Sequence, residues 1–138
     1  MAAAKATAEL AEAAEFAEAA DTDALIWLHT THRRTRRLAA ASPLYVSPAT
    51  ILELQFLIEL GRIRLRRGAG VGAVVDDDRW LADDPPAAAW FTRALALAWT
   101  NDPFDRLIVA HAQLRGWRLA TSDPDMLAQM SATARVEL

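Results

Sequence analysis

The stretch Asn101–Ala112, which reads NDPFDRLIVAHA, constrains the fold of this chain more than any other part of the sequence. Asp102 can cap a helix, Pro103 suits the first helical position, and Asp105 falls in the first turn, where the helix dipole favours a carboxylate. Capping alone explains such an Asp-Pro pair. The apolar residues that follow cover a broad helix face: Phe104, Leu107, Ile108, Ala112 and Leu114. The pattern predicts a helix that packs on a sheet, with two carboxylates at its start.

Acidic residues recur beside other predicted elements. Asp21 precedes the apolar run ALIWL, Glu53 lies in a long apolar helix pattern, and Asp123 follows the strand-like RLAT. Ligands of open α/β sheets bind beyond the carboxyl ends of the strands, so these acids could converge on one edge. Crowded carboxylates repel each other unless a cation is present, and all-oxygen ligation favours Mg²⁺ or Mn²⁺.

Four stretches carry a resemblance to a known family. They are DTDALIWL from Asp21, SPATILEL from Ser47, NDPFDRLIVAHA from Asn101, and LATSD ending at Asp123. In this order they resemble the PIN domain family of metal-dependent ribonucleases, and most closely the VapC toxins of bacterial toxin–antitoxin pairs. The resemblance implies a single PIN-like α/β domain over residues 21–138, with a mainly parallel central sheet of four to five strands flanked by helices. Residues 1–20 form an Ala- and Glu-rich segment, expected as a helix or a weak first strand.

The resemblance implies a Mg²⁺- or Mn²⁺-dependent endoribonuclease that hydrolyses RNA phosphodiester bonds as the toxin of a toxin–antitoxin pair. The family's acidic quartet, catalytic and metal-binding, falls on Asp21, Glu53, Asp105 and Asp123. By this carry-over Asp21 and Asp105 bind the metal directly. Glu53 and Asp123 bind through water or complete a second metal position.

Supporting roles fall on neighbouring residues. Asp102 is weighted equally between helix cap and outer ligand. Thr22 and Thr121 or Ser122 orient carboxylates or phosphate by hydroxyl hydrogen bonds, and Arg106 steadies Asp102 or contacts RNA phosphate.

The partners implied are an RNA substrate, a cognate antitoxin and a second copy of the chain. The pattern of Pro48–Leu60 is apolar nearly all round, so this helix has neighbours on two sides. An alternative is a catalytically inactive PIN-fold interaction module, because EFAEAA before Asp21 is unlike a buried Val-, Ile- and Leu-rich strand. A DNA nuclease with the same chemistry also stays open, since nothing in the sequence identifies recognition of a 2′-hydroxyl group.

Asp21 and Asp23 also form a D-x-D pair, as in the haloacid dehalogenase phosphatases. That family needs a downstream Lys to hold the phosphate, and the single Lys here, Lys5, lies upstream, so we reject this reading. His111 on the apolar helix pattern is interpreted as a core or edge histidine. A run of acids is interpreted as solvated surface: Asp76, Asp77, Asp78, Asp83 and Asp84.

Composition bounds the remaining possibilities. A chain of 138 residues with 53% apolar content supports one domain, and the absence of cysteine excludes disulfides and thiolate sites. No stretch is apolar enough to span a membrane, and glutamates interrupt the N-terminal segment, so we expect a cytoplasmic protein. The net charge is −3, but arginines cluster at 33–37 and 62–67. Arg suits phosphate, although a solvated helix face is the better explanation of each run taken alone.

The other expected elements follow from local patterns. Strands are expected near Glu15–Ala20 and at Leu44–Val46, Ala87–Phe91, Arg118–Thr121 and Arg135–Leu138. Helices are expected at Thr22–Leu28, His32–Ala41, Pro48–Leu60, Val74–Leu81 and Thr92–Trp99, at Asp102–Gly116, and for one turn from Pro124.

Overall fold

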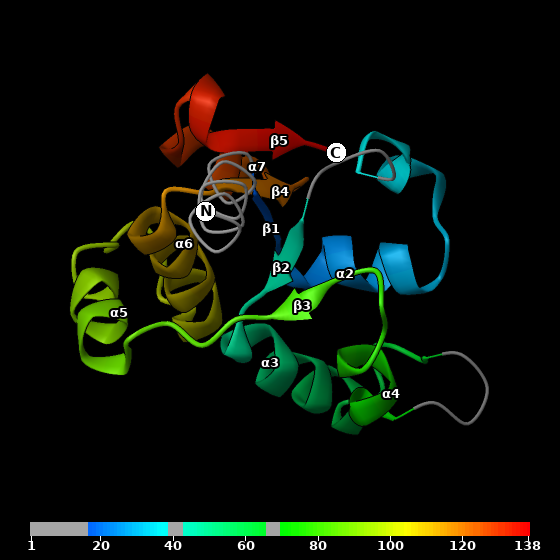
Figure 1. Cartoon of the computed structure of the whole chain (residues 1–138). Coiled ribbons are helices and arrows are strands. Elements are labelled where there is room, and N and C mark those ends of the chain that lie inside the picture. Colours follow the sequence, from blue (N-terminus) through cyan, green and yellow to red (C-terminus); the bar gives the residue numbers. More distant parts are fainter. Residues whose placement is uncertain (1–16, 39–42, 66–69) are drawn as a thin grey trace, which may run out of the picture.

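A single parallel sheet organises the protein (Figure 1). The computed structural model describes residues 17–38, 43–65 and 70–138. Its described strands pair in the order β3-β2-β1-β4-β5, and every pair is parallel. The strands are β1 (Glu18–Ala20), β2 (Leu44–Val46), β3 (Leu81–Ala82), β4 (Arg118–Thr121) and β5 (Arg135–Glu137). The predicted α/β fold with a mainly parallel sheet is confirmed.

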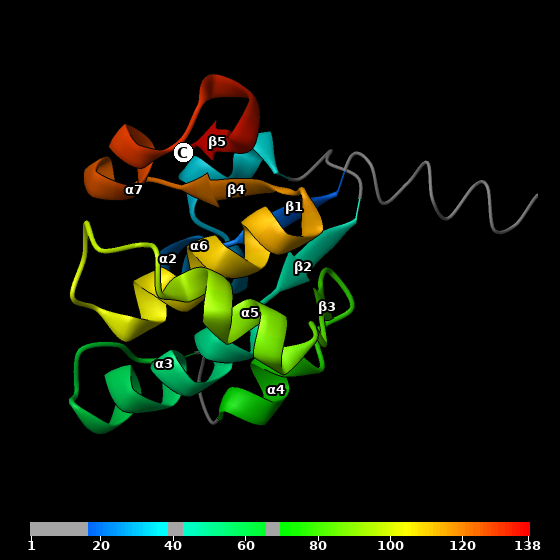
Figure 2. The same ribbon diagram turned by 90° about the vertical axis from the view of Figure 1, so that its left-hand side faces the viewer.

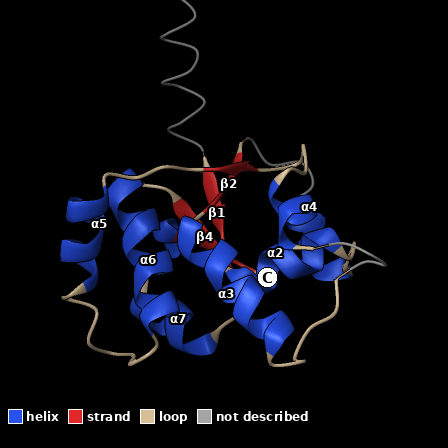
Figure 3. Ribbon diagram, turned by 90° about the horizontal axis from the view of Figure 1, so that it is seen from below, coloured by secondary structure: helices blue, strands red, loops and turns tan. Residues whose placement is uncertain are grey.

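Helices cover both faces of this sheet. Figure 3 shows α5 and α6 on one side and α2 and α4 on the other, and Figure 2 shows α5 and α6 in front of the strands. The described helices are α2 (Thr22–His29), α3 (Pro48–Glu59), α4 (Val71–Val75), α5 (Ala87–Ala94), α6 (Pro103–Arg115) and α7 (Pro124–Gln129), with 3-10 turns η1 (Arg33–Arg37) and η2 (Ala132–Ala134). None of these described helices has the length and apolarity needed to cross a membrane.

Two apolar clusters fill the space between sheet and helices. One includes Ile108 of α6 and Leu119 of β4, and the other includes Leu25 of α2 and Leu54 of α3. All four of these side chains are at most 2% exposed. The sheet is therefore covered on both faces, as parallel sheets require.

Strand β1 is central although its sequence is poor in large apolar residues. Glu18, its first residue, is only 3% exposed, and its carboxylate pairs with Arg118 at the start of β4. The two residues lie side by side in the register of the parallel pair. Because a buried carboxylate is tolerated when it is paired, this contact lets Glu18 occupy a doubly covered strand. Glu15 lies outside the described residues.

The segment after Pro85 and Pro86 was predicted wrongly. Ala87–Phe91 was expected as an edge strand and Thr92–Trp99 as a helix, but the structure has one helix, α5, from Ala87 to Ala94. Its alanines favour helix, and its buried residues Trp90 and Ala94 are spaced by four, as one helix face requires. The Trp90 indole Nε1 donates to the carbonyl of Leu107 at 2.7 Å, which attaches α5 to α6.

Two other helix predictions were misplaced. The helix expected at Val74–Leu81 instead spans Val71–Val75, and Leu81 begins strand β3. Asp77 turns the chain between them, because its Oδ1 accepts from the backbone nitrogen of Arg79 at 2.9 Å. The helix expected at His32–Ala41 is a 3-10 turn over Arg33–Arg37, and residues 39–42 lie outside the described part of the chain.

The acids expected on the surface include two exceptions: Asp77, whose carboxylate pairs with Arg79, and Asp83. Asp83 follows β3, and its Oδ2 lies 2.6 Å from Nε2 of His111 and 2.8 Å from Nε of Arg115. His111 is 1% exposed and lies near the rings of Trp90 and Trp117. His111 is therefore a core histidine, as predicted, but Asp83 is its partner and not a solvated acid.

Candidate functional site

Six carboxylates line one pocket at the carboxyl edge of the sheet. The pocket has a volume of about 230 Å³, and its acids are Asp21, Asp23, Glu53, Asp102, Asp105 and Asp123. Asp21 directly follows β1 and Asp123 lies just beyond β4, two strands that pair with each other. The chain leaves β1 toward β2 and later returns to β4 on its other side, so the pocket lies where the strand order reverses.

Three of these acids cap helices that begin at the pocket. Oδ1 of Asp21 accepts from the backbone nitrogen of Ala24, Oδ1 of Asp102 from Phe104, and Oδ1 of Asp123 from Asp125, each at 2.8 Å. Pro103 and Pro124 occupy first-turn positions of α6 and α7. The caps therefore fix where α2, α6 and α7 begin, and the fold brings the three starts to one pocket. A capping carboxylate still has a second oxygen with which to bind a cation.

Helix α3 brings a further carboxylate, Glu53. Ser47 caps this helix by accepting from the nitrogen of Ala49 at 3.2 Å. One carboxylate oxygen from each of Glu53, Asp102 and Asp105 lies within 4.8 Å of the others. Oxygen atoms gathered so closely fit a single hard cation such as Mg²⁺ or Mn²⁺.

Burial and repulsion make this pocket unfavourable for so many negative charges. Burial raises the pKa of Asp21 to about 7; hydrogen bonds from Thr121 and the Ala24 nitrogen oppose the rise, and Asp23 and Asp123 add to it. The pKa of Asp105 is also raised to about 7, by burial first and then by the charges of its acidic neighbours.

The same forces act on two further acids. Burial raises the pKa of Glu53, with a hydrogen bond from Thr22 opposing and the charges of Asp102 and Asp23 contributing. Burial and then Asp123 raise the pKa of Asp23. None of the described residues lining the pocket is basic, so no described lining side chain balances these negative charges.

The residues predicted to support the acids differ in position. Thr22 lines the pocket, and its Oγ1 lies 3.4 Å from Oγ1 of Thr50. Thr121 is buried, and its Oγ1 accepts from the nitrogen of Asp123 at 3.0 Å. Ser122 is half-buried and is not among the described residues that line the pocket.

Arg106 contacts the loop that precedes α6. Its Nε donates to the carbonyl of Thr100 at 2.7 Å, and the Thr100 hydroxyl accepts from the nitrogen of Asp102 at 3.1 Å. Arg106 therefore braces the loop that carries Asp102, and its contact with RNA phosphate stays a prediction.

Asp23 is the pocket acid that sequence reasoning left without a role. In the sequence analysis, Asp23 was interpreted only as part of a phosphatase-like pair with Asp21. It lies in the first turn of α2, two residues after the cap, and it lines the pocket beside Asp21. The D-x-D spacing at a helix start was the available signal, since both positions belong to the end of the helix that faces the site.

Comparisons with known proteins agree with this architecture. The PIN domain profile matches residues 19–132. A chain of a toxin–antitoxin complex from Klebsiella pneumoniae superimposes with a TM-score of 0.62 at 19% identity, covering 88% of this chain and 99% of that one. A chain of the VapBC2 complex of Rickettsia felis, solved bound to a promoter DNA fragment, gives 0.63 at 14% identity, covering 88% and 98%.

A third solved structure, FitAcB from Neisseria gonorrhoeae, gives a TM-score of 0.50 at 20% identity, covering 80% of this chain and 91% of that chain. No curated protein matches the sequence. The profile match extends over most of the chain and includes all six pocket acids. The chain therefore belongs to the PIN domain family.

Proposed function

We propose that this protein is a Mg²⁺- or Mn²⁺-dependent endoribonuclease and the toxin of a toxin–antitoxin pair. The observation that carries the proposal is the pocket in which six carboxylates meet with no basic side chain among the described lining residues. An arrangement that raises the pKa values of Asp21 and Asp105 to about 7 destabilises the protein at neutral pH unless a cation is bound. Electrostatic destabilisation of this kind is typical of a metal site without its ion.

Asp105 is the central ligand in this proposal. It belongs both to the pair inferred from the family resemblance, Asp21 and Asp105, and to the oxygen cluster of Glu53, Asp102 and Asp105. Asp21 and Asp123 complete the acidic wall from the strand ends. A bound Mg²⁺ or Mn²⁺ ion supplies a water of lowered pKa and offsets charge on the leaving oxygen of a phosphodiester.

The chain's own residues hold this pocket in shape. Hydrogen bonds from Thr22 to Glu53 and from Thr121 to Asp21 favour the ionised carboxylates and orient them. The N-terminal ends of α2, α6 and α7 add partial positive charge beside the acids that cap them. Arg106 braces the loop before α6, which keeps Asp102 next to Asp105.

An exposed apolar stripe supports the partner assignment. Leu52 and Phe56 of α3 and Leu60, the residue that caps its end, lie four residues apart and are 52%, 44% and 65% exposed. Phe56 also contacts Phe104, at the start of α6, with the rings 5.6 Å apart. The stripe therefore runs beside the acidic pocket, and a protein that covers it can also close the pocket. We assign this stripe as the surface that contacts an antitoxin and a second copy of the chain. The protein acts in the cytoplasm, where RNA substrates occur.

Cleavage of a structured RNA in Mn²⁺ or Mg²⁺ tests the activity. We expect the wild type to cleave and both Asp105→Asn and an EDTA control to lose cleavage by at least about 100-fold. Asp84→Asn is the matched control, because Asp84 is exposed and outside the pocket. Absence of cleavage by the wild type on several RNAs, together with no thermal stabilisation by Mn²⁺, would support the inactive interaction module. Preference for a DNA of the same sequence would identify a DNA nuclease.

Sedimentation of the purified protein tests the partner surface. We expect a dimer, and a shift toward monomer for the double variant Leu52→Glu, Leu60→Glu, because charges on an apolar interface are costly. Leu95→Glu is the matched control, since Leu95 is 76% exposed and lies just after α5. A wild type that remains monomeric and soluble at high concentration would contradict this part of the proposal.

A further inference from the structure

A basic ridge lies at the far end of helix α2 from the acidic pocket. It consists of Arg33, Arg34 and Arg36 on the 3-10 turn η1, which begins four residues after α2 ends. All three side chains are exposed, and none forms a salt bridge with a described residue. Three positive charges on one turn, without an ion pair to any described residue, favour an anionic partner in a protein whose net charge is −3.

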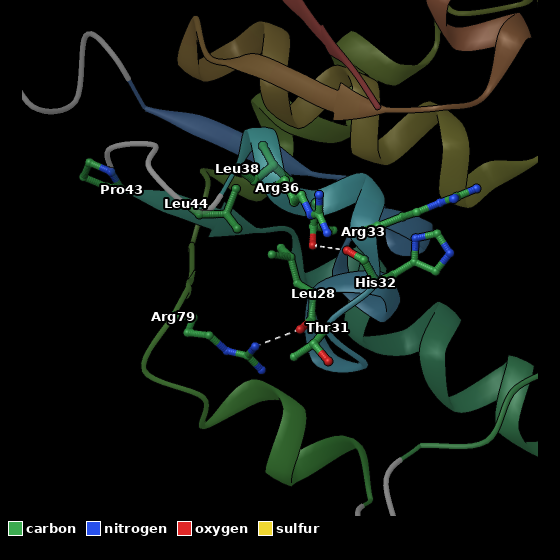
Figure 4. Close-up of a pocket in the computed structure, with 10 residues that line it drawn as sticks. Leu28, Thr31, His32, Arg33, Arg36, Leu38, Pro43, Leu44 and Arg79 are labelled. Atoms are coloured by element: carbon green, nitrogen blue, oxygen red, sulfur yellow. Dashed lines mark hydrogen bonds between the residues drawn. The ribbon is translucent and has the colours of Figure 1, made fainter.

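The ridge separates two hollows. On one side, Arg33 and Arg36 border a pocket that includes Leu28, Leu38 and Leu44, as Figure 4 shows. On the other side, all three arginines line a hollow with Glu137 and Leu138, where the end of β5 approaches η1 (Figure 1). An extended ligand that crosses the ridge therefore meets the same arginines from both sides.

Not every arginine near these hollows is available to a ligand. Arg79 also lines the first pocket, but its guanidinium pairs with Asp77 and donates to the carbonyl of Leu28 at 2.8 Å (Figure 4). Its charge therefore serves the protein's own structure. By contrast, Arg33, Arg34 and Arg36 of the basic ridge form no ion pair with a described residue, and the guanidinium of Arg34 contacts the ring of Trp27.

Planar groups beside the ridge indicate which polyanion it suits. The guanidinium carbon of Arg34 lies 5.1 Å from the centre of the Trp27 ring, and Trp27 stacks with His32 at 5.3 Å. Trp27 is half-buried, while Arg34 and His32 are exposed. Charged forks that bind phosphate, next to flat groups on which bases stack, are the features with which proteins bind single-stranded nucleic acid.

We propose that the basic ridge, with Trp27 and His32, is a binding site for the single-stranded part of the RNA substrate, outside the acidic pocket. The identity of the ligand rests on the proposed function. The six carboxylates of the pocket repel phosphates, so an enzyme with such a pocket gains from a positive surface within reach of the same strand. Helix α2 connects the two places and, at eight residues, spans only about 12 Å.

Binding of a fluorescent 12-nucleotide single-stranded RNA in EDTA tests the inference without cleavage. We expect the triple variant Arg33→Ala, Arg34→Ala, Arg36→Ala to bind on the order of tenfold more weakly at low salt, with the slope of log affinity against log salt reduced by about 2. The charge-matched control is Arg62→Ala, Arg64→Ala, Arg93→Ala, whose three arginines are also exposed. We expect the control to keep the wild-type slope more closely.

Stacking gives a second, non-electrostatic measurement. Trp27→Leu keeps an apolar side chain in place but removes the ring, so we expect a roughly fivefold loss of RNA affinity with an unchanged salt slope. Thermal unfolding of every variant confirms that it is folded.

Three outcomes would overturn the inference. One is wild-type RNA affinity in the triple variant, and another is an equal loss in both triple variants, since binding would then follow net charge alone. The third is loss of a co-purified protein partner from the triple variant with unchanged RNA binding, which would make the ridge a protein interface. RNA binding that depends on the ridge in a protein that cleaves no RNA would refute only the proposed nuclease activity.

Discussion

The two ends of helix α6 hold carboxylates in opposite ways. At its start, Asp105 and Asp102 meet Glu53 in a pocket without a basic lining residue, and burial and like charge raise the pKa of Asp105 to about 7. Near its end, His111 and Arg115 both contact Asp83. Burial would raise the pKa of Asp83, but hydrogen bonds from Arg115 and His111 outweigh it and keep that pKa below its ordinary value.

This difference between the two ends of α6 indicates that one end serves ligand binding and the other stabilises the fold. The paired end contributes to folding, because the neutral His111 donates from Nε2 to a carboxylate that stays ionised, and burial lowers the pKa of the imidazole. The acidic end opposes folding in the absence of a cation. We therefore infer that the acidic cluster at the start of α6 serves binding, because it is unfavourable for folding. The Asp83 cluster near the other end keeps the helix in place.

The largest expected effect is at the acidic end. Asp105→Asn removes the central ligand, and we expect the loss of cleavage described above together with a rise in melting temperature in EDTA, because one repelling charge is gone. Differential scanning fluorimetry and the cleavage assay measure the two changes on one sample. A variant that lost both activity and stability would show that Asp105 has a structural role, and the contrast between the two ends would fail.

A smaller effect is expected at the paired end. Asp83→Ala leaves a buried imidazole without its partner, and we expect a loss of about 2 to 3 kcal/mol in the free energy of unfolding. Urea denaturation measures this loss, with the exposed Asp84→Ala as control. A cost similar to that of the control would show that the Asp83 cluster contributes little to stability.

The pH dependence of stability gives the finest test. The pKa values of Asp21 and Asp105 are near 7 in the folded chain and near 3.8 when unfolded, so the folded state holds more protons between these values. Their contribution to stability is therefore present at low pH and is lost as the pH rises through about 7. Asp83 acts in the opposite direction, since its stabilising contribution is lost only as the pH falls below about 4.

In EDTA we accordingly expect the melting temperature to fall by roughly 5 °C between pH 5.5 and pH 8, and to fall less in Asp105→Asn. Mn²⁺ should stabilise the wild type more at pH 8 than at pH 5.5, because its ligands must lose their protons. A melting temperature that rises with pH in EDTA would contradict the raised pKa values.

Local signals in the sequence were sufficient for the elements that carry the pocket. Capping residues followed by proline, as in Asp102-Pro103 and Ser47-Pro48, predicted the starts of α6 and α3, because a cap and its first turn depend on neighbouring residues only. Arg118–Thr121 was predicted with the bounds of β4. The alternation of strands and helices predicted the parallel sheet.

Only the tertiary structure decided how residues distant in the sequence pair. It attached α5 to α6 through Trp90, paired Glu18 with Arg118, and gave His111 its partner Asp83. It also gathered oxygens of Glu53, Asp102 and Asp105. These outcomes depend on contacts between residues that are up to 100 positions apart in the sequence. A local sequence pattern carries no information about which distant side chain will contact a given residue. The sequence by itself therefore determined which acids lie near the ends of helices and strands. The fold decided which of these carboxylates lie close enough to repel one another and which are paired with a basic side chain.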